Sequence, residues 1–204
     1  MAAHGLTILG VDPGLTRCGL AAVYATPDRA VRIRDVGVAT SEPGEELAAR
    51  LVRVADEIEA WLDRLQPDAV AVERVFAQSN VSTVASTAQV AGLAMVAAQR
   101  RGLPVTLHTP SEVKAAVTGN GRAGKEQVAT MVARILGVDK VPRPADATDA
   151  LALAICHAWR GSPATGVSEG SGDGTAAQRA WREAARRAAR SPRRVAAARP
   201  TVGR

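Results

Sequence analysis

Hydrophobic and polar positions in the first third of the chain follow two different periods. Three short stretches rich in Val, Ala, Leu and Ile, at 6–12, 18–25 and 30–39, are separated by Pro-Gly and Pro-Asp turns, and they predict a meander of antiparallel strands. Over 45–65 the apolar residues instead recur every three or four positions, which is typical of an amphipathic helix packed on a sheet. Three strands followed by a helix are therefore expected.

A continuous apolar run follows at 69–73, and it ends in an acid, Glu73. Such a run predicts a central strand that is buried on both faces. Beyond it, the pattern and the turn residues predict a helix, a strand and three further helices, at 79–101, 104–109, 110–117, 125–136 and 145–160. Ser79 is the expected cap of the first of these helices. The order βββαβαβ, followed by helices, predicts an α/β domain.

The composition changes after Gly161, first to Ser, Gly, Pro and Thr and then to an Ala/Arg segment at 176–199. The formal net charge is +6, but residues 1–161 carry 17 of the 26 Lys and Arg residues and 17 of the 20 Asp and Glu residues. The whole excess of positive charge therefore belongs to 162–204. We expect a globular domain at 1–161 and a basic, disordered tail at 162–204, which is either simply solvated or adds electrostatic attraction to nucleic acid.

Some classes of protein are excluded by what the sequence lacks. No apolar stretch approaches the roughly 18–20 residues that span a bilayer, and no basic and apolar signal region opens the chain, so a cytoplasmic protein without a membrane partner is expected. Cys18 and Cys156 lie far apart, without a CxxC motif or clustered His, which favours buried, reduced thiols over a disulfide or a zinc site.

Four acids stand out by position. Asp12 and Glu73 end predicted neighbouring strands, and Asp146 and Asp149 lie at i, i+3 on one face of the first turn of the last helix. If that helix packs beside the strand ends, the four carboxylates converge and repel one another unless a cation is present. Oxygen-only ligands suit Mg²⁺ or Mn²⁺, and two such ions about 3.5–4 Å apart can drive phosphodiester cleavage.

Each acid taken singly also has an ordinary structural explanation. Asp in Asp-Pro-Gly is a common turn former, and acids in a first helical turn stabilise the helix dipole. Glu73 is harder to explain in this way, because a carboxylate that closes an apolar central strand needs a partner or a metal. The combination of the four, rather than any one of them, indicates a catalytic site.

The segments that carry these acids resemble the crossover junction endodeoxyribonuclease (RuvC) family, the bacterial Holliday junction resolvases. The matching segments read ILGVDPG at 8–14, VERVF at 72–76 and DATDALA at 146–152, and the resemblance covers about 6–160. It implies a ribonuclease H-like α/β fold, with a central mixed five-stranded sheet flanked by helices. It also implies Mg²⁺-dependent, symmetric hydrolysis of four-way DNA junctions in recombination and repair, which leaves 5′-phosphate and 3′-hydroxyl ends.

The resemblance also implies roles for individual residues. The four acids would be the ligands of Mg²⁺, two ions per active site, with Mn²⁺ able to substitute. Phe76, one of few aromatics in the chain, would stack on an unpaired base near the junction. Lys114 and Lys125 would lie near the scissile phosphate, where an ammonium offsets charge that develops in the transition state. Arg74 and Arg122 are expected as further DNA contacts.

The symmetry of the four-way DNA junction bears on the expected oligomeric state of the enzyme. Its near two-fold symmetry makes a homodimer the simplest source of two symmetric nicks. A stripe of small residues on the helix at 79–101 is a candidate part of the dimer interface, although the stripe could equally pack on the chain's own sheet; it comprises Ala85, Ala88, Ala91 and Gly92. Association with the RuvAB branch-migration complex follows from the resemblance alone.

Other interpretations of the same residues stay open. The segment at 12–16 also resembles the phosphate-binding turn of actin-like ATPases, although those need two such domains, and a related ribonuclease H-like nuclease could act on structured RNA. A noncatalytic DNA-binding module is disfavoured by the intact carboxylates. Residues 119–125 match GxGxxG and the start of a Walker A motif, but Glu126 replaces the required Ser or Thr and a helix precedes the turn, so we judge both matches false.

Overall fold

Five strands and five helices make up the part of the chain described by the computed structural model, residues 5–75 and 81–160. In chain order they are β1 (Leu6–Asp12), β2 (Arg17–Ala25), β3 (Val31–Thr40), α1 (Leu47–Leu65), β4 (Ala69–Glu73), α2 (Val81–Arg100), β5 (Val105–His108), α3 (Pro110–Thr118), α4 (Lys125–Leu136) and α5 (Ala145–Arg160). The predicted order of elements is confirmed, with the ends shifted by at most two residues. The expected cap Ser79 and the expected tail at 162–204 lie outside the described residues.

The strands form one mixed sheet in the order β3-β2-β1-β4-β5. β1, β2 and β3 pair antiparallel as a meander, whereas β4 runs parallel to β1, and β5 parallel to β4. The register pairs Val11 of β1 with Val72 of β4, and Glu73 with His108 of β5. Because parallel strands end at the same edge of a sheet, Asp12 and Glu73 are brought to one edge.

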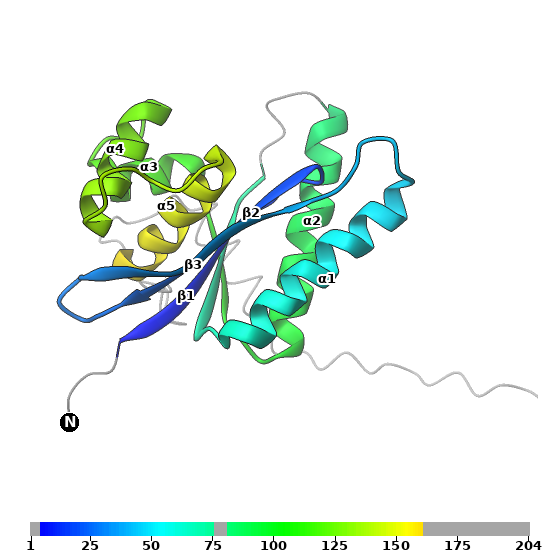
Figure 1. Cartoon of the computed structure of the whole chain (residues 1–204), viewed down its shortest axis with the longest axis horizontal. Coiled ribbons are helices and arrows are strands. Elements are labelled where there is room, and N and C mark those ends of the chain that lie inside the picture. Colours follow the sequence, from blue (N-terminus) through cyan, green and yellow to red (C-terminus); the bar gives the residue numbers. More distant parts are fainter. Residues whose placement is uncertain (1–4, 76–80, 161–204) are drawn as a thin grey trace, which may run out of the picture. The chain divides into compact units, whose positions relative to one another are not determined.

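Helices cover both faces of this sheet, with α1 and α2 on one side and α3, α4 and α5 on the other (Figure 1). Alternate residues of β1 therefore enter two separate cores: Leu9 and Val11 pack towards α1 and α2, and Ile8 packs towards α5. The central strands are largely apolar because helices cover both faces of the sheet there. The two cores consist mainly of Ala, Val, Leu and Ile, as the low aromatic content requires.

Helix α5 lies unusually close to the sheet, and two glycines allow it. A Cβ atom at Gly10 would be 2.3 Å from the carbonyl oxygen of Ala150, and one at Gly19 would be 2.1 Å from the carbonyl oxygen of Asp146. A helix backbone can reach these positions only where the strand has no side chain. The approach places the first turn of α5 directly against the ends of β1 and β2.

Helix α5 is buried on nearly every side. From Ala147 to His157 every residue except Asp149 is buried, because the helix packs on the sheet with one side and against α3 and α4 with others. Asp149 keeps partial exposure at the edge of the sheet, beside the strand ends. The packing therefore surrounds the helix but leaves its acidic edge open.

The small residues of α2 do not form one continuous surface. Ala91 is buried in the core below α2, whereas Ala85 and Ala88 are exposed. Val96, at helical spacing from Ala88, is 50% exposed. The stripe is thus divided between the chain's own core and an outer face.

Two further expectations concern the thiols and the membrane. Cys18 and Cys156 are both buried and free, as predicted. Within residues 5–75 and 81–160, no helix combines the length and the apolar character that a membrane span requires.

Candidate active site

The four acids gather at the edge of the sheet where β1 and β4 end. Asp12 pairs in register with Gly19 of β2, and the backbone of Asp146 lies directly over that glycine. Glu73 ends the strand next to β1, and Asp149 follows Asp146 by one helical turn. Two strand ends and one helix N-terminus therefore bring together residues that are up to 137 positions apart.

Mutual repulsion shows in the acid–base properties of this group. Burial, followed by the negative charges of Glu73, Asp149 and Asp146, raises the pKa of Asp12 to about 8. Burial and the charge of Asp149 raise the pKa of Glu73. Burial also raises the pKa of Asp149, against the lowering effect of Lys125. The site thus holds more negative charge than its own cations balance.

Three basic side chains oppose this charge. The Nζ atom of Lys125, the first residue of α4, is 3.8 Å from Oδ2 of Asp149. Lys114 on α3 lowers the pKa values of both Glu73 and Asp149. Both lysines therefore lie close to the carboxylates.

The third cation, Arg17, was not among the residues predicted from the sequence. Its Nε and Nη2 atoms both lie 2.7 Å from Oδ2 of Asp146. Alternation along β2, which is readable in the sequence, puts Arg17 on the same face as Gly19, and the register with β1 puts that face on the side of Asp12. Which acid it would meet is not readable, because Asp146 is 129 residues further along the chain.

The donors in this group suit a hard divalent cation, since they are carboxylate oxygens throughout. As the side chains stand, no three His, Cys, Asp or Glu residues in the described part of the chain are close enough together to hold a metal ion. The physical reason is that carboxylates without a cation repel one another, and Arg17 and Lys125 each draw one acid into an ion pair. The chemistry of the donors thus fits a hard divalent cation.

Three other predicted DNA contacts have different surroundings. Arg74 is exposed, and its backbone N–H donates to the carbonyl oxygen of His108 at 2.8 Å. Arg122 is exposed in the turn between α3 and α4, where its backbone N–H donates to Oδ1 of Asn120 at 3.0 Å. Phe76 lies outside the described residues, so its predicted stacking role stays a prediction.

The Gly-rich segment between α3 and α4 connects two helices. Gly119 ends α3 with a positive φ of 77°, and Gly124 caps the start of α4. A dinucleotide-binding or Walker A turn would instead follow a strand. The expected helix before the turn is therefore confirmed, and this context argues against both motif matches.

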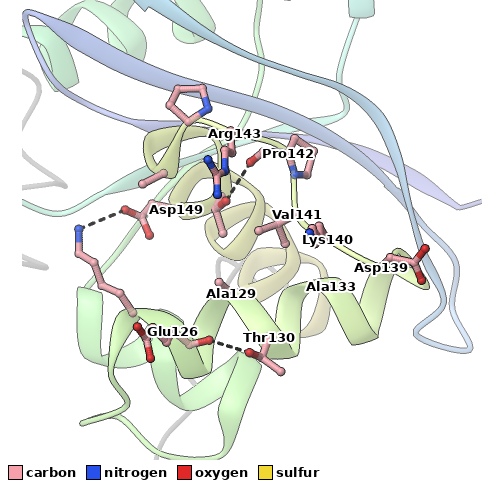
Figure 2. Close-up of a pocket in the computed structure, with 14 residues that line it drawn as sticks. Glu126, Ala129, Thr130, Ala133, Asp139, Lys140, Val141, Pro142, Arg143 and Asp149 are labelled. Atoms are coloured by element: carbon pink, nitrogen blue, oxygen red, sulfur yellow. Dashed lines mark hydrogen bonds and ion pairs between the residues drawn. The ribbon is translucent and has the colours of Figure 1, made fainter.

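A cavity of about 490 Å³ opens beside Asp149, between α4 and the segment at 139–145 (Figure 2). The ion pair between Lys125 and Asp149 lies at its border, and Thr148 donates a hydrogen bond to the carbonyl oxygen of Pro142 at 3.2 Å. Its charged lining residues are equally divided between acids and bases, namely Glu126, Asp139, Asp149, Lys125, Lys140 and Arg143. The formal charges of the lining therefore sum to zero.

A buried histidine pair adjoins the site. His108, which pairs in register with Glu73, has its Nε2 atom 3.1 Å from Nδ1 of His157 on α5. Burial lowers the pKa of His108, and burial together with the charge of His108 lowers the pKa of His157 to about 4. Both rings are therefore neutral at neutral pH, and one donates the hydrogen bond that the other accepts. The pair ties α5 to the end of β5.

Replacing His157 with Gln is expected to make the protein less sensitive to acid. Histidines of the unfolded chain take up protons near pH 6.5, whereas His157 in the folded protein does so near pH 4, so the free energy of unfolding falls as pH decreases between these values. Gln keeps a polar partner for His108 but cannot titrate. The free energy of unfolding, measured with urea, should fall between about pH 7 and about pH 5 in both proteins. The fall should be about 1–2 kcal/mol smaller in the variant than in the parent. Equal losses in the two proteins would contradict the prediction.

Comparisons with known proteins bear on this site. The model of the family described as "Crossover junction endodeoxyribonuclease RuvC" matches residues 8–157, a range that includes all four acids. A protein of that name from Clavibacter michiganensis is 57% identical over 196 residues, covering 89% of this chain and 97% of its own length. Another, from Frankia alni, is 61% identical over 156 residues, covering 76% of this chain and 79% of its own length.

Solved structures agree with the sequence relatives. RuvC of Thermus thermophilus in complex with a Holliday junction substrate is similar with a TM-score of 0.72 and 36% identity, covering 76% of this chain and 94% of that one. Thermus thermophilus RuvC in a second structure gives a TM-score of 0.70 at 36% identity, covering 75% of this chain and 93% of that one. These structures have the ribonuclease H-like fold, and the expected fold is confirmed. The chain belongs to the RuvC family of crossover junction endodeoxyribonucleases.

Proposed function

We propose that this crossover junction endodeoxyribonuclease hydrolyses Holliday junctions with Mg²⁺ held by Asp12, Glu73, Asp146 and Asp149. The observation that carries the proposal is the meeting of these four carboxylates at one edge of the sheet, where burial and the charges of the other three raise the pKa of Asp12 to about 8. Such an excess of negative charge favours hard divalent cations, which also make a negatively charged phosphate acceptable there. We expect two Mg²⁺ ions per site, with Mn²⁺ able to replace them.

Bound Mg²⁺ supplies activation of the attacking water and stabilisation of the leaving oxygen in phosphodiester hydrolysis. The protein's own residues orient the DNA around that reaction. Lys125 and Lys114 approach the carboxylates from α4 and α3, and this supports the proposal that their ammonium groups contact the oxygens of the scissile phosphate. Arg74 and Arg122 are exposed and are proposed as contacts to phosphates further along the strands.

Phe76 is proposed to stack on an unpaired base near the point of strand exchange. Replacing it with Ala should leave junction affinity within about threefold of the parent, because phosphate contacts dominate affinity. Cleavage should fall by about tenfold or more, because stacking of one base is worth about 1–3 kcal/mol. Gel-shift and single-turnover cleavage on the same junction separate the two effects, and an unchanged rate would remove Phe76 from the mechanism.

We further propose that the enzyme acts as a homodimer through the exposed face of α2. Ala88 and the half-exposed Val96 form an apolar surface on that helix. Replacing Ala88 with Glu should then convert the dimer to a monomer in analytical ultracentrifugation, whereas the same change at Gln99, an exposed polar residue at the end of α2, should not. A variant at Ala88 that remains dimeric would eliminate this interface.

Three wider expectations complete the proposal. Association with the RuvAB branch-migration complex and action in the bacterial cytoplasm follow from the family. The tail at 162–204 is proposed as a basic arm that adds nonspecific attraction to DNA, since it carries the chain's whole positive excess.

The direct test uses one preparation of the full chain on several substrates. A synthetic four-way junction, a linear duplex of the same sequence and a structured RNA are each incubated with Mg²⁺ and with chelator. Paired nicks in opposite strands of the junction, present with Mg²⁺ and absent with chelator, support the proposal. Cleavage of RNA without cleavage of the junction would favour a ribonuclease, and binding of ATP in titration calorimetry would favour an actin-like nucleotide site.

A further inference from the structure

Arg17 is a charged residue at the candidate site to which neither the motifs nor the proposed mechanism gives a role. It begins β2, its side chain is 48% exposed, and both its Nε and its Nη2 lie 2.7 Å from Oδ2 of Asp146. Asp146 itself is 31% exposed. A guanidinium that gives two N–H groups to one carboxylate oxygen occupies the directions from which that oxygen would bind anything else.

The position of Arg17 follows from the sheet and not from a flexible surface contact. Arg17 and Gly19 project to the same face of β2, and Gly19 is the residue over which the backbone of Asp146 lies. The carboxylate of Asp146 is thereby held within reach of the guanidinium by the same close approach that places α5. The pair is therefore built into the junction of β2 and α5.

The chemistry of this contact makes it exclusive with metal binding at Oδ2 of Asp146. A divalent ion such as Mg²⁺ lies about 2.0–2.1 Å from its oxygen ligands, and a guanidinium and a divalent cation on the same oxygen would repel each other at short range. In the metal-free protein the guanidinium instead offsets part of the negative charge of the four acids. Because half of its side chain is exposed, Arg17 can leave Asp146 for solvent without breaking the core.

We propose that Arg17 is a positioning residue that holds Asp146 in the metal-free enzyme and is displaced when a divalent cation takes Asp146. The inference rests on the proposed metal site. It adds that the guanidinium of Arg17 competes with cations for Asp146, so that removing Arg17 tightens cation binding. A merely structural ion pair would predict no change, or weaker binding through loosened packing.

The first experiment measures Mn²⁺ binding to the full chain without DNA by titration calorimetry. The Arg17→Gln variant should bind Mn²⁺ about 3- to 10-fold more tightly than the parent, and Arg17→Lys should lie between the two, since one ammonium makes a weaker pair than a guanidinium. Arg64→Gln is the matched control, because it removes the same charge from another partly exposed ion pair, with Asp35 on β3, and should leave Mn²⁺ affinity unchanged. Equal or weaker binding by Arg17→Gln overturns the inference.

Two further measurements distinguish displacement from a simple change of charge. In an Asp146→Asn background, Arg17→Gln should change Mn²⁺ affinity less than twofold, and a full gain there would overturn action through Asp146. The Nε–H resonance of Arg17 in NMR should shift and exchange faster with water when Mg²⁺ is added, and a resonance that stays unchanged at saturating Mg²⁺ would also overturn it. If the parent itself binds no Mn²⁺, or binds it equally well after Asp12→Asn, then the proposed metal site fails and this inference fails with it.

Discussion

Replacing Asp12 with Asn is expected to reduce cleavage of four-way junctions by at least about 1000-fold. Asp12 ends the central strand, and Glu73, Asp146 and Asp149 all act on its pKa. Asn has nearly the same shape but no charge, so the site keeps its geometry and loses part of its attraction for Mg²⁺. Gel-shift affinity for the junction in chelator should stay within about threefold of the parent, because the phosphate contacts are untouched.

The same substitution should stabilise the protein when no metal is present. The pKa of Asp12 is raised from 3.8 to about 8, so the folded chain binds more protons than the unfolded chain between these values, and the free energy of unfolding falls as pH rises from about 4 to about 8. Asn removes this loss. Denaturant unfolding in chelator should show the variant more stable than the parent by about 1–3 kcal/mol at about pH 8, with a smaller difference at about pH 5.

Asp56, an exposed acid on α1, provides the control. Asp56→Asn removes the same charge far from the strand ends, and it should cleave junctions as fast as the parent. Mg²⁺ should raise the unfolding midpoint of the parent and of Asp56→Asn but not that of Asp12→Asn. A variant at Asp12 that still cleaves, or that is less stable than the parent at about pH 8 in chelator, would contradict the assignment of Asp12 to the metal site.

Replacing Gly19 with Ala is expected to have the second large effect on cleavage, because it displaces catalytic groups without changing any charge. The added Cβ would lie 2.1 Å from the carbonyl oxygen of Asp146, so the first turn of α5 must move away from β2. Overpacking of this kind costs about 1–3 kcal/mol of stability. A displacement of about 1 Å at a catalytic group can cost about 100-fold in rate, so cleavage should fall much further than stability does.

Gly44 offers a matched control for this change. It lies before α1, and a Cβ there would have no atom within 4 Å. Gly44→Ala should therefore leave both the unfolding free energy and the cleavage rate close to those of the parent. If Gly19→Ala cleaves at the parent rate while remaining folded, the close approach of α5 is not needed for activity.

Much of the candidate site could be anticipated from local patterns. A continuous apolar run that ends in an acid identified Glu73 as the end of a buried strand, and Asp12 closes a similar run. The i, i+3 spacing put Asp146 and Asp149 on one edge of a helix, and the structure keeps Asp149 partly open there. These inferences need only the periods of strands and helices, which are properties of the chain over a few residues.

Local sequence patterns could not predict other features of the structure around the site. The sequence periodicity over Ala147–His157 does not show that α5 is buried on most sides. The sheet buries one side of the helix, and α3 and α4 bury others. The small residues on α2 looked like one surface, yet Ala91 entered the core while Ala88 stayed outside, since the tilt of the helix on the sheet decides which positions are covered.

The amino-acid sequence by itself determined the order and approximate ends of the strands and helices, the division between a first part of zero net charge and a basic end, and the four acids with their places on those elements. Only the tertiary structure decided that β1 and β4 lie side by side, that Gly10 and Gly19 admit α5, and that Arg17 meets Asp146. The physical reason is distance along the chain: period and charge are local, whereas register, close approach and ion pairing depend on how remote segments pack together.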